Sequence, residues 1–428
     1  MNANSNRFWE THWWRHAAIV FTGSMIISLL FVTFVPRAFY ADTGPDFRAF
    51  YGPVARNILA GRGIVQNDGQ PAIRYPPGYP SLLVPLIATA KALGTTDSCT
   101  IRIFNFLGLA VGVVLLFFCA VGSWEIRHAY VVAALWATYP FNLFFLLYPS
   151  AEIPFEVLLF SAVLLFLHHF QRQRPSFIWF FVCGILVGCA MLIRPIALVL
   201  APVLALGYWI AGPRLAYTRR LTVAMALTLG TLITILPWEM WVCCKTDRIV
   251  LLSSLGPSSL KDGLTFAAGN KTFRHGVYVP GDVRQLMTRL TSQYESIQTY
   301  GDVARAISRE TKEHPLAVLK LYLIKVARSW YGTDSQRWEL EIALVQCPYL
   351  LLTTFAGFCC WRSGGKPRRL VTLIAVIVLY FWFMNIMSTT IARFSVPSMA
   401  LMFLLVPGVV TKQTRGISLS VTPVDPTG

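Results

Sequence analysis

Four ionisable side chains stand apart in this 428-residue sequence, and their types suit binding and chemistry at an anion. Asp46 precedes an amphipathic stretch, Glu152 precedes a long apolar run, and Arg194 and Arg393 are each the sole charge between two apolar runs. An arginine presents a planar fork of donors that matches phosphate oxygens, and a carboxylate can accept the proton of an attacking hydroxyl. We therefore predict that these four residues converge at one surface.

Each of the four also has a structural interpretation that the sequence leaves open. Asp46 could cap the first turn of the helix that follows it. Glu152 could complement the dipole at the N-terminus of its helix. Arg194 and Arg393 could be anchors whose charged ends extend to a membrane interface.

Three further residues extend the predicted site. Arg74 and Tyr75 directly precede Pro76-Pro77-Gly78, where the prolines fix an extended backbone and the glycine permits a sharp turn. Glu156 lies one helical turn beyond Glu152, inside an apolar run, where a carboxylate is costly unless it faces protein or water. We predict that Glu156 faces the protein interior, where it can contact substrate; alternatively, it complements the helix dipole. From the residues alone, Arg74 and Tyr75 are interface anchors beside a stiff connector.

The composition requires these residues to be positioned by membrane helices. The sequence is 55% hydrophobic and 13% charged, with a mean hydropathy of +0.56, which is more apolar surface than a soluble domain can bury. The net charge of +17 comes from residues scattered between apolar runs, so it indicates membrane flanks rather than nucleic-acid binding. Ten runs approach or reach spanning length: 17–36, 103–123, 129–151, 153–171, 175–193, 195–213, 221–238, 342–361, 370–392 and 394–411.

The distribution of Lys and Arg predicts the orientation of these spans. Among the termini and short connections, nearly all basic residues fall on one face, including Arg127, Arg219 and Arg368, and the other face has only Arg194 and Arg393. Cytoplasmic loops are enriched in Lys and Arg. We therefore predict a multi-pass protein of the cell (inner or plasma) membrane, with both termini cytoplasmic and the active site on the extracytoplasmic (periplasmic) face.

The fold class predicted is an all-α integral membrane bundle of about ten transmembrane helices with amphipathic helices on the outer face. The run 79–93 is short and contains prolines, so it is expected to be re-entrant or interfacial. The segment 316–331 mixes basic and apolar residues, as an interfacial helix does, within an outer segment that shows no pattern of a compact domain. The parts expected are a catalytic module 1–241 with its outer loop 37–102, an outer segment 242–341, C-terminal spans 342–412 and a polar cytoplasmic tail 413–428.

The order of motifs resembles the GT-C class of membrane glycosyltransferases. Asp46 is followed by Asn57-Ile-Leu-Ala-Gly61 and Pro76-Pro-Gly-Tyr-Pro80, and then by Tyr-Pro-Ser-Ala-Glu152, Arg194-Pro195, Pro237-Trp238 and a late Arg393. The chain looks closest to the branch of lipid A aminoarabinose transferases, protein O-mannosyltransferases and bacterial galacturonosyl transferases. It departs from their pattern where Phe47 follows Asp46 in place of a second acid, and where Glu239 follows Pro237-Trp238 in place of an Arg-Asn pair.

The resemblance implies transfer of a sugar, with inversion, from a polyprenyl-phosphate carrier to an extracytoplasmic glycan, lipid or protein. It implies Asp46 and Glu152 as the catalytic acids, with Arg74, Tyr75, Arg194, Arg393 and Glu156 at the substrate or its phosphate. The expected partners are membrane lipids, the lipid-linked sugar and the acceptor, and no nucleic acid. No cofactor and no metal ion is implied. A transporter or flippase of a lipid-linked or small solute is the alternative.

Overall fold

The computed structural model describes residues 13–39, 44–170, 172, 175–213, 216–266 and 279–409. The predicted tail 413–428 lies outside these ranges. Within them the chain forms helices and no strand, with one antiparallel bridge between Val65 and Pro71. The helices of the first half are α2 (Trp13–Phe34), η1 (Arg37–Phe39), η2 (Phe47–Tyr51), α3 (Gly52–Leu59), α4 (Gly78–Ala92), α5 (Asp97–Val121), α6 (Ile126–Ala137), α7 (Pro140–Leu143), η3 (Phe144–Leu146), α8 (Glu152–Phe170), α9 (Phe177–Ile193), η4 (Pro195–Ala197) and α10 (Leu200–Ala211). The helices of the second half are α11 (Tyr217–Thr246), α12 (Gly256–Thr265), α13 (Gly281–Ser292), η6 (Tyr294–Ser296), α14 (Tyr300–Glu313), α15 (Pro315–Arg328), α16 (Glu339–Ser363), α17 (Gly365–Met387), η7 (Ala392–Phe394) and α18 (Val396–Phe403).

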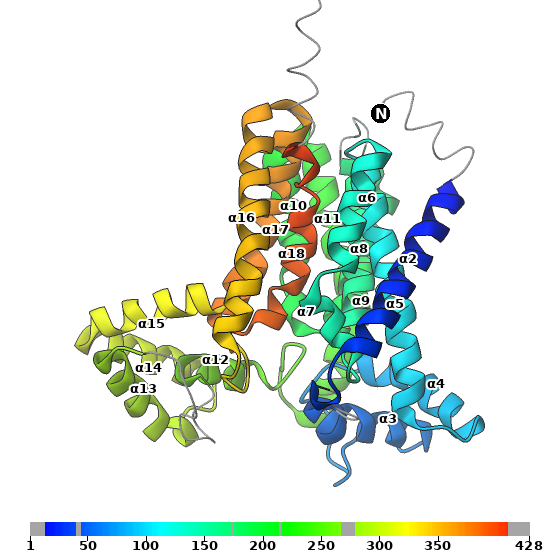
Figure 1. The fold of residues 1–428 in the computed structure, drawn as a ribbon. Helices are drawn as coiled ribbons and strands as arrows, with labels where there is room; N and C mark the ends of the chain where they lie inside the picture. The colour runs from blue at the N-terminus through cyan, green and yellow to red at the C-terminus, as the bar shows by residue number, and fades with distance from the viewer. Residues whose placement is uncertain are drawn as a thin grey trace, which may run out of the picture.

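The long apolar helices form a bundle whose members run side by side (Figure 1). In the described ranges six helices are long and apolar enough to cross a membrane, and a pair bent by 54°, Ile126–Ala137 with Pro140–Leu146, raises this to seven. Three shorter apolar helices coincide with the remaining predicted runs. The prediction of an all-α multi-pass membrane protein is confirmed. The count of about ten spans stays a prediction, because only six or seven segments meet the length criterion.

The bend within the third span has a local cause. Tyr139 adopts an extended conformation and Pro140 occupies the first turn of α7. The residue before a proline disfavours the helical region, and proline cannot donate the next helical hydrogen bond. The chain therefore breaks between α6 and α7 and is redirected before it reaches Glu152.

Extramembrane helices gather at one end of the bundle. In Figure 1, α3 and α4 lie at the lower end beneath α2 and α5, and α12 to α15 lie at the lower left beneath α16. The helix α4 has 15 residues and is not a candidate span. Its length agrees with the expectation that the run 79–93 is not a full span, and its re-entrant or interfacial position stays a prediction.

The outer segment has a small core of its own, which the sequence did not indicate. Side chains from α12 to α15 enclose it, and Val283, Leu286, Met287 and Leu321 are at its centre. The predicted helix 316–331 is present as α15. Its buried face carries Ala317, Leu321, Lys325 and Arg328, while Leu316, Leu319 and Leu323 are exposed on the other side. An exposed apolar stripe is what an interfacial helix presents to lipid.

Candidate active site

The four ionisable residues singled out in the sequence converge on one cluster. The Arg194 guanidinium contacts the Glu152 carboxylate in a close ion pair. Arg393 lies between the two acids, with Nε 3.6 Å from Glu152 Oε1 and Nη2 3.8 Å from Asp46 Oδ2. The Phe394 ring packs under both guanidinium groups, 5.0 Å from Arg194 and 5.4 Å from Arg393. The predicted convergence of these side chains is therefore present.

Each of these side chains stands at the end of a helix. Glu152 is the first residue of α8, and Arg194 follows the last residue of α9, where Pro195 prevents the helix from continuing. Arg393 belongs to the short turn η7 between α17 and α18. Asp46 precedes the π-helical turn η2. Helix ends can present polar groups to water while the helices themselves stay in lipid, so the bundle itself assembles this cluster.

Asp46 does not cap the helix that follows it. Its side chain makes no capping hydrogen bond, and instead Oδ1 accepts a hydrogen bond of 3.1 Å from the Tyr75 hydroxyl. Burial and the negative charge of Asp46 raise the pKa of Tyr75 to about 12, so the hydroxyl stays protonated and can donate this bond. The structure thus excludes the capping interpretation and joins Tyr75 to the cluster.

Glu152 has the most enclosed position in the cluster. Its side chain is 8% exposed, against 41% for Asp46 and 31% for Arg393. A buried carboxylate is stable only when it is paired, and Arg194 and Arg393 provide that pairing. Glu152 is therefore suited to holding the two arginines, whereas Asp46 is accessible from outside.

An acid that the sequence analysis missed also acts on this cluster. Burial opposes the charge of Arg393, but the carboxylates of Asp334, Glu152 and Asp46 together raise the pKa of its guanidinium. Asp334 lies in the turn between α15 and α16 and is exposed. It stands in the polar stretch Thr333-Asp-Ser-Gln-Arg337, where no pattern in the sequence singles it out. Only the folded chain reveals its proximity.

Aromatic side chains enclose the Asp46 side of the cluster. Tyr51 contacts Tyr75 and Tyr79, with ring centroids 4.9 Å apart in both pairs. Tyr148 lies close to Glu152, and burial followed by that negative charge raises the pKa of its phenol. Rings with hydroxyl groups around carboxylates are well suited to a sugar, because they offer flat apolar faces together with donors.

Several buried polar atoms at or near this end of α8 have no hydrogen-bond partner among the described residues. They are the Tyr79 hydroxyl, Ser150 Oγ, Glu156 Oε1 and Arg393 Nε. Buried polar groups are nearly always satisfied by protein or water. A group of unsatisfied ones is typical of a place where a bound molecule or water completes the contacts.

Arg74 occupies the rim of the site. Its exposed guanidinium lies 5.7 Å from the Tyr75 ring. The backbone beside it is anchored to the chain that leaves α11: Ser253 Oγ donates to Arg74 O at 2.6 Å, and Ser254 N donates to Ile73 O at 3.1 Å. Its predicted contact with a phosphate stays a prediction.

Trp238 and Glu239 take part in this anchoring. Glu239 is the residue that follows Pro237-Trp238 where the resembled family has an Arg-Asn pair. Trp238 Nε1 donates to Leu252 O at 3.0 Å, and Glu239 Oε1 accepts from Leu252 N at 2.7 Å. Leu252 is thereby fixed to α11 just before Ser253. The end of α11 thus positions the loop that carries Arg74 and Tyr75.

Glu156 lies one turn deeper and bonds to the interior of the bundle. In the amide orientation that its neighbours require, Asn142 donates to Glu156 Oε2 at 3.0 Å and accepts from Trp136 Nε1 at 3.3 Å. Glu156 is 2% exposed. It therefore faces protein, as expected for an acid inside a span, and its predicted contact with substrate stays a prediction.

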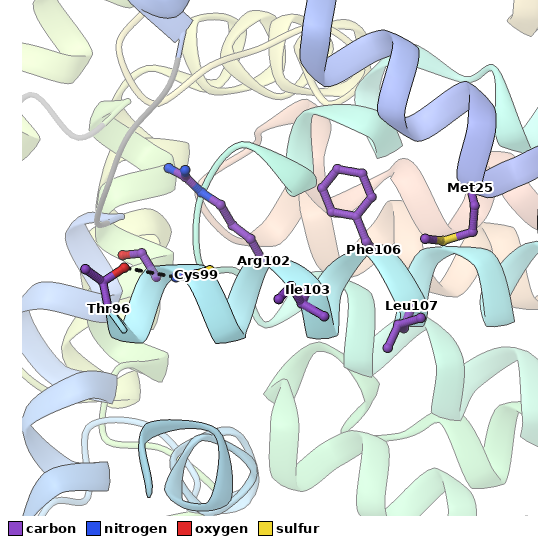
Figure 2. A pocket seen from close by; sticks show the side chains of 8 residues that line it. Met25, Thr96, Cys99, Arg102, Ile103, Phe106 and Leu107 are labelled. Atoms are coloured by element: carbon purple, nitrogen blue, oxygen red, sulfur yellow. Dashed lines mark hydrogen bonds between the residues drawn. The ribbon is translucent and has the colours of Figure 1, made fainter. Parts of the chain in front are cut away.

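A separate pocket of about 370 Å³ opens between α2 and α5. Figure 2 shows Thr96, Cys99 and Arg102 at one end of it and Met25, Phe106 and Leu107 at the other. Its lining includes none of the clustered acids and arginines, and its charged residue is Arg102 of α5, so it is not the candidate active site. In the described ranges, no group of three His, Cys, Asp or Glu residues is placed to hold a metal ion.

Comparison with known proteins agrees with the resemblance drawn from the motifs. Residues 80–241, less than half of the chain, match the family described as dolichyl-phosphate-mannose-protein mannosyltransferase. This stretch contains Glu152, Arg194 and Pro237-Trp238. No curated protein matches the chain in sequence.

An oligosaccharyltransferase of known structure shares the fold at low sequence identity. The archaeal oligosaccharyltransferase AglB from Archaeoglobus fulgidus, in complex with an inhibitory peptide and a dolichol-phosphate, aligns with a TM-score of 0.56 and 12% identity over 98% of this chain and 53% of that chain. Its apo form aligns with a TM-score of 0.55 and 12% identity, over 98% of this chain and 54% of that chain. ArnT from Cupriavidus metallidurans bound to undecaprenyl phosphate aligns with a TM-score of 0.39 and 14% identity, over 98% of this chain and 82% of that chain.

This chain spans about half the length of the oligosaccharyltransferase. At this identity the likeness shows the fold alone. Together with the family match, it confirms the resemblance to the GT-C class of membrane glycosyltransferases.

Proposed function

We propose that this chain is a membrane glycosyltransferase that moves a sugar from a polyprenyl-phosphate carrier to an acceptor outside the cytoplasm. The observation that carries the proposal is the meeting of Arg194 and Arg393 with Asp46 at the helix ends, beside apolar helices that a prenyl chain can lie against. The match of residues 80–241 to a mannosyltransferase family supports it. So do the dolichol-phosphate bound to the oligosaccharyltransferase, which corresponds to a lipid carrier, and the acceptor peptide tethered to the Archaeoglobus fulgidus oligosaccharyltransferase in another structure.

The proposed reaction is a single displacement with inversion at the anomeric carbon. The acceptor oxygen forms a bond to that carbon while the bond to the carrier phosphate breaks, and the polyprenyl phosphate leaves with the electron pair. Arg393 stabilises the charge that develops on the phosphate. Arg194, which is paired with the same Glu152 as Arg393, adds a second positive charge beside it. Because the leaving group is itself an anion, no general acid is required.

Asp46 is proposed as the base that accepts the proton of the acceptor hydroxyl. It is the most exposed acid of the ion-paired cluster, and Tyr75 and Arg393 hold its two oxygens in a defined orientation. If the acceptor is itself a phosphate, no base is needed and Asp46 orients the sugar. Glu152 is proposed to act through the two arginines.

The orientation proposed for this site is extracytoplasmic, on the evidence of the Lys and Arg distribution. A transporter is disfavoured, because transporters place their ionisable residues near the middle of the bilayer. Here the ion-paired acids and arginines lie at helix ends, and the shared fold is that of a glycosyl-transferring enzyme.

The test is donor consumption in reconstituted membranes. Purified protein in liposomes would receive polyprenyl-phosphate sugars and a cell-envelope extract as acceptor, and release of free polyprenyl phosphate would be followed by mass spectrometry. We expect release by the wild type and by Arg289→Gln, whose arginine pairs with Glu310 in the outer segment. Arg393→Gln should lose release by about 10²–10³-fold, as removal of a charge-stabilising donor does. Equal rates for Arg393→Gln and wild type would contradict the assignment.

A further inference from the structure

Arg393 lies in the loop 388–395. A buried network of hydrogen bonds joins this loop to α15 and to the turn that follows α15. Arg328, at the end of α15, is 2% exposed. It forms a two-pronged ion pair with Glu339 of α16, Nη2 to Oε1 at 2.6 Å and Nε to Oε2 at 3.3 Å. The remaining Arg328 donor, Nη1, donates to Thr390 O at 3.1 Å. A buried charge with each prong occupied holds its partners in one geometry.

Thr390 is held in a conformation that threonine disfavours. Its φ of 61° lies in the left-handed region, where a β-branched side chain is crowded against the backbone. Such a conformation persists only when neighbouring contacts over-determine it. The hydrogen bond from Arg328 to the Thr390 carbonyl is one of these contacts.

The turn after α15 adds a direct backbone contact to the same loop. Ala392 N, adjacent to Arg393, donates to Gly332 O at 2.8 Å. A Cβ on Gly332 would lie 2.7 Å from Thr390 O and 2.8 Å from Arg328 Cγ, so only glycine permits this approach. Asp334, whose charge acts on Arg393, stands two residues further along the same turn.

Further hydrogen bonds join the end of α15 to the end of α17 and the loop that follows it. Lys325 Nζ donates to Ser388 O at 3.3 Å. The fully buried Asn385 donates to Ser329 O at 3.0 Å and to Ile391 O at 2.9 Å. Together these contacts fix the loop 388–395 at several points, and Arg393 is the residue of that loop that reaches the acids of the cluster.

We propose that the Arg328–Glu339 pair is a positioning device, which holds the loop 388–395 so that Arg393 faces a lipid-linked phosphate at the site. Arg328 and Glu339 are positioning residues, and they act on substrate only through Arg393. The part of this inference that concerns phosphate rests on the proposed function, whereas the part that concerns the loop does not.

The experiment has two readouts in purified full-length protein. Hydrogen exchange of the segment 388–395 reports the loop without any ligand, and the Kd for undecaprenyl phosphate reports the site. The variants are Arg328→Lys and Glu339→Gln, with Arg289→Lys as the matched control. Arg289 pairs with the buried Glu310 within the same outer segment and not with this loop.

We expect faster exchange of the segment in Arg328→Lys and Glu339→Gln than in Arg289→Lys, and a Kd weakened about tenfold, the size of a typical coupling energy. The double variant Arg328→Lys, Arg393→Gln should bind no more weakly than Arg393→Gln alone. A residue that only stabilises the fold would weaken binding in both backgrounds.

Unchanged exchange in both variants would overturn the proposal, and so would faster exchange with an unchanged Kd or additive losses in the double variant. If the wild type binds no undecaprenyl phosphate, the proposed function fails. The exchange rates then still decide whether the pair holds the loop.

Discussion

Asp46 is distinguished from its neighbours in the cluster by exposure and by its two partners. Its carboxylate is 41% exposed, accepts a hydrogen bond from Tyr75 and lies 3.8 Å from Arg393. A base must be reachable by the acceptor and held in orientation, and these contacts meet both conditions. Arg194 and Glu152, by contrast, are enclosed and paired with each other.

Asp46→Asn should therefore separate chemistry from binding. We expect the transfer rate to fall by about 10²–10⁴-fold, the contribution of a positioned base. The Kd for polyprenyl phosphate should stay the same or become tighter, because a negative charge near Arg393 is removed. Rate and Kd would be measured in the same preparation, with Asp68→Asn as a control for an exposed acid of the same outer loop. A normal rate would refute the assignment as base.

The sequence predicted the residues of this cluster because Arg194 and Arg393 are sole charges between apolar runs, and because Asp46 and Glu152 directly precede an amphipathic stretch and a long apolar run. The lack of such a pattern explains what was missed, since Asp334 and Arg328 stand in polar or mixed stretches. Their roles depend on contacts across about sixty residues of chain, such as Arg328 to Thr390. No local pattern in a sequence encodes such a contact.

Lys325 gives a prediction about pH. Burial, and then the charge of Arg328, lower the pKa of this amine from 10.5 to about 7. Between these two values the unfolded chain binds a proton that the folded chain does not, so the free energy of unfolding rises with pH across that window. Below pH 7 both states are protonated and this residue adds no further pH dependence.

Lys325→Met should remove that slope. Unfolding would be followed in detergent from pH 7 to 9, with Lys320→Met as the control, because Lys320 lies on the same helix but is exposed and paired with Asp282. We expect the control to keep the rise in stability and Lys325→Met to lack it. The same slope in both variants would show that Lys325 is protonated in the folded protein.

At the scale of helices, close packing depends on residues without a side chain. A Cβ on Gly230 of α11 would lie 2.1 Å from Phe181 O of α9. Membrane helices use small residues to bring their backbones together. The apolar length of each helix was visible in the sequence, but the partner of each helix was not, because hydropathy does not specify which faces meet.

Gly230→Ala should destabilise the bundle by about 1–3 kcal/mol, the usual effect of overpacking a core. Gly23→Ala on α2 is the matched control, since a Cβ there meets nothing within 4 Å. It should be neutral or raise stability by about 0.5–1 kcal/mol, as alanine does within a helix. Thermal unfolding of both variants in the same detergent is the measurement. Equal unfolding temperatures would contradict the close approach of α9 and α11.

For the whole molecule, the arrangement places α3, α4 and α12 to α15 at one end of the bundle. The hydropathy and charge of the sequence were sufficient to predict this division. The small core of the outer segment was not predicted, because its buried residues come from four short helices. Three of them, α12 to α14, are predominantly polar in sequence, so none of these three shows an apolar run that indicates a shared core.

The proposed orientation can be tested with single cysteines. In a background in which the exposed Cys99, Cys243, Cys244 and Cys347 are replaced by serine, Asp68→Cys reports the outer loop and Glu125→Cys reports the turn between α5 and α6. A membrane-impermeant maleimide should label Asp68→Cys in intact cells and Glu125→Cys only after permeabilisation. The opposite pattern would place the site in the cytoplasm.

Binding of a lipid phosphate by Arg393 and Arg194 is the central requirement of the proposed function. The most direct measurement is an experimental structure of the protein in lipid nanodiscs with undecaprenyl phosphate. We predict phosphate density within hydrogen-bonding distance of Arg393 and next to Arg194, with the prenyl chain between helices facing lipid. A phosphate bound elsewhere, or a continuous polar path through the bundle with no lipid at these arginines, would contradict the account.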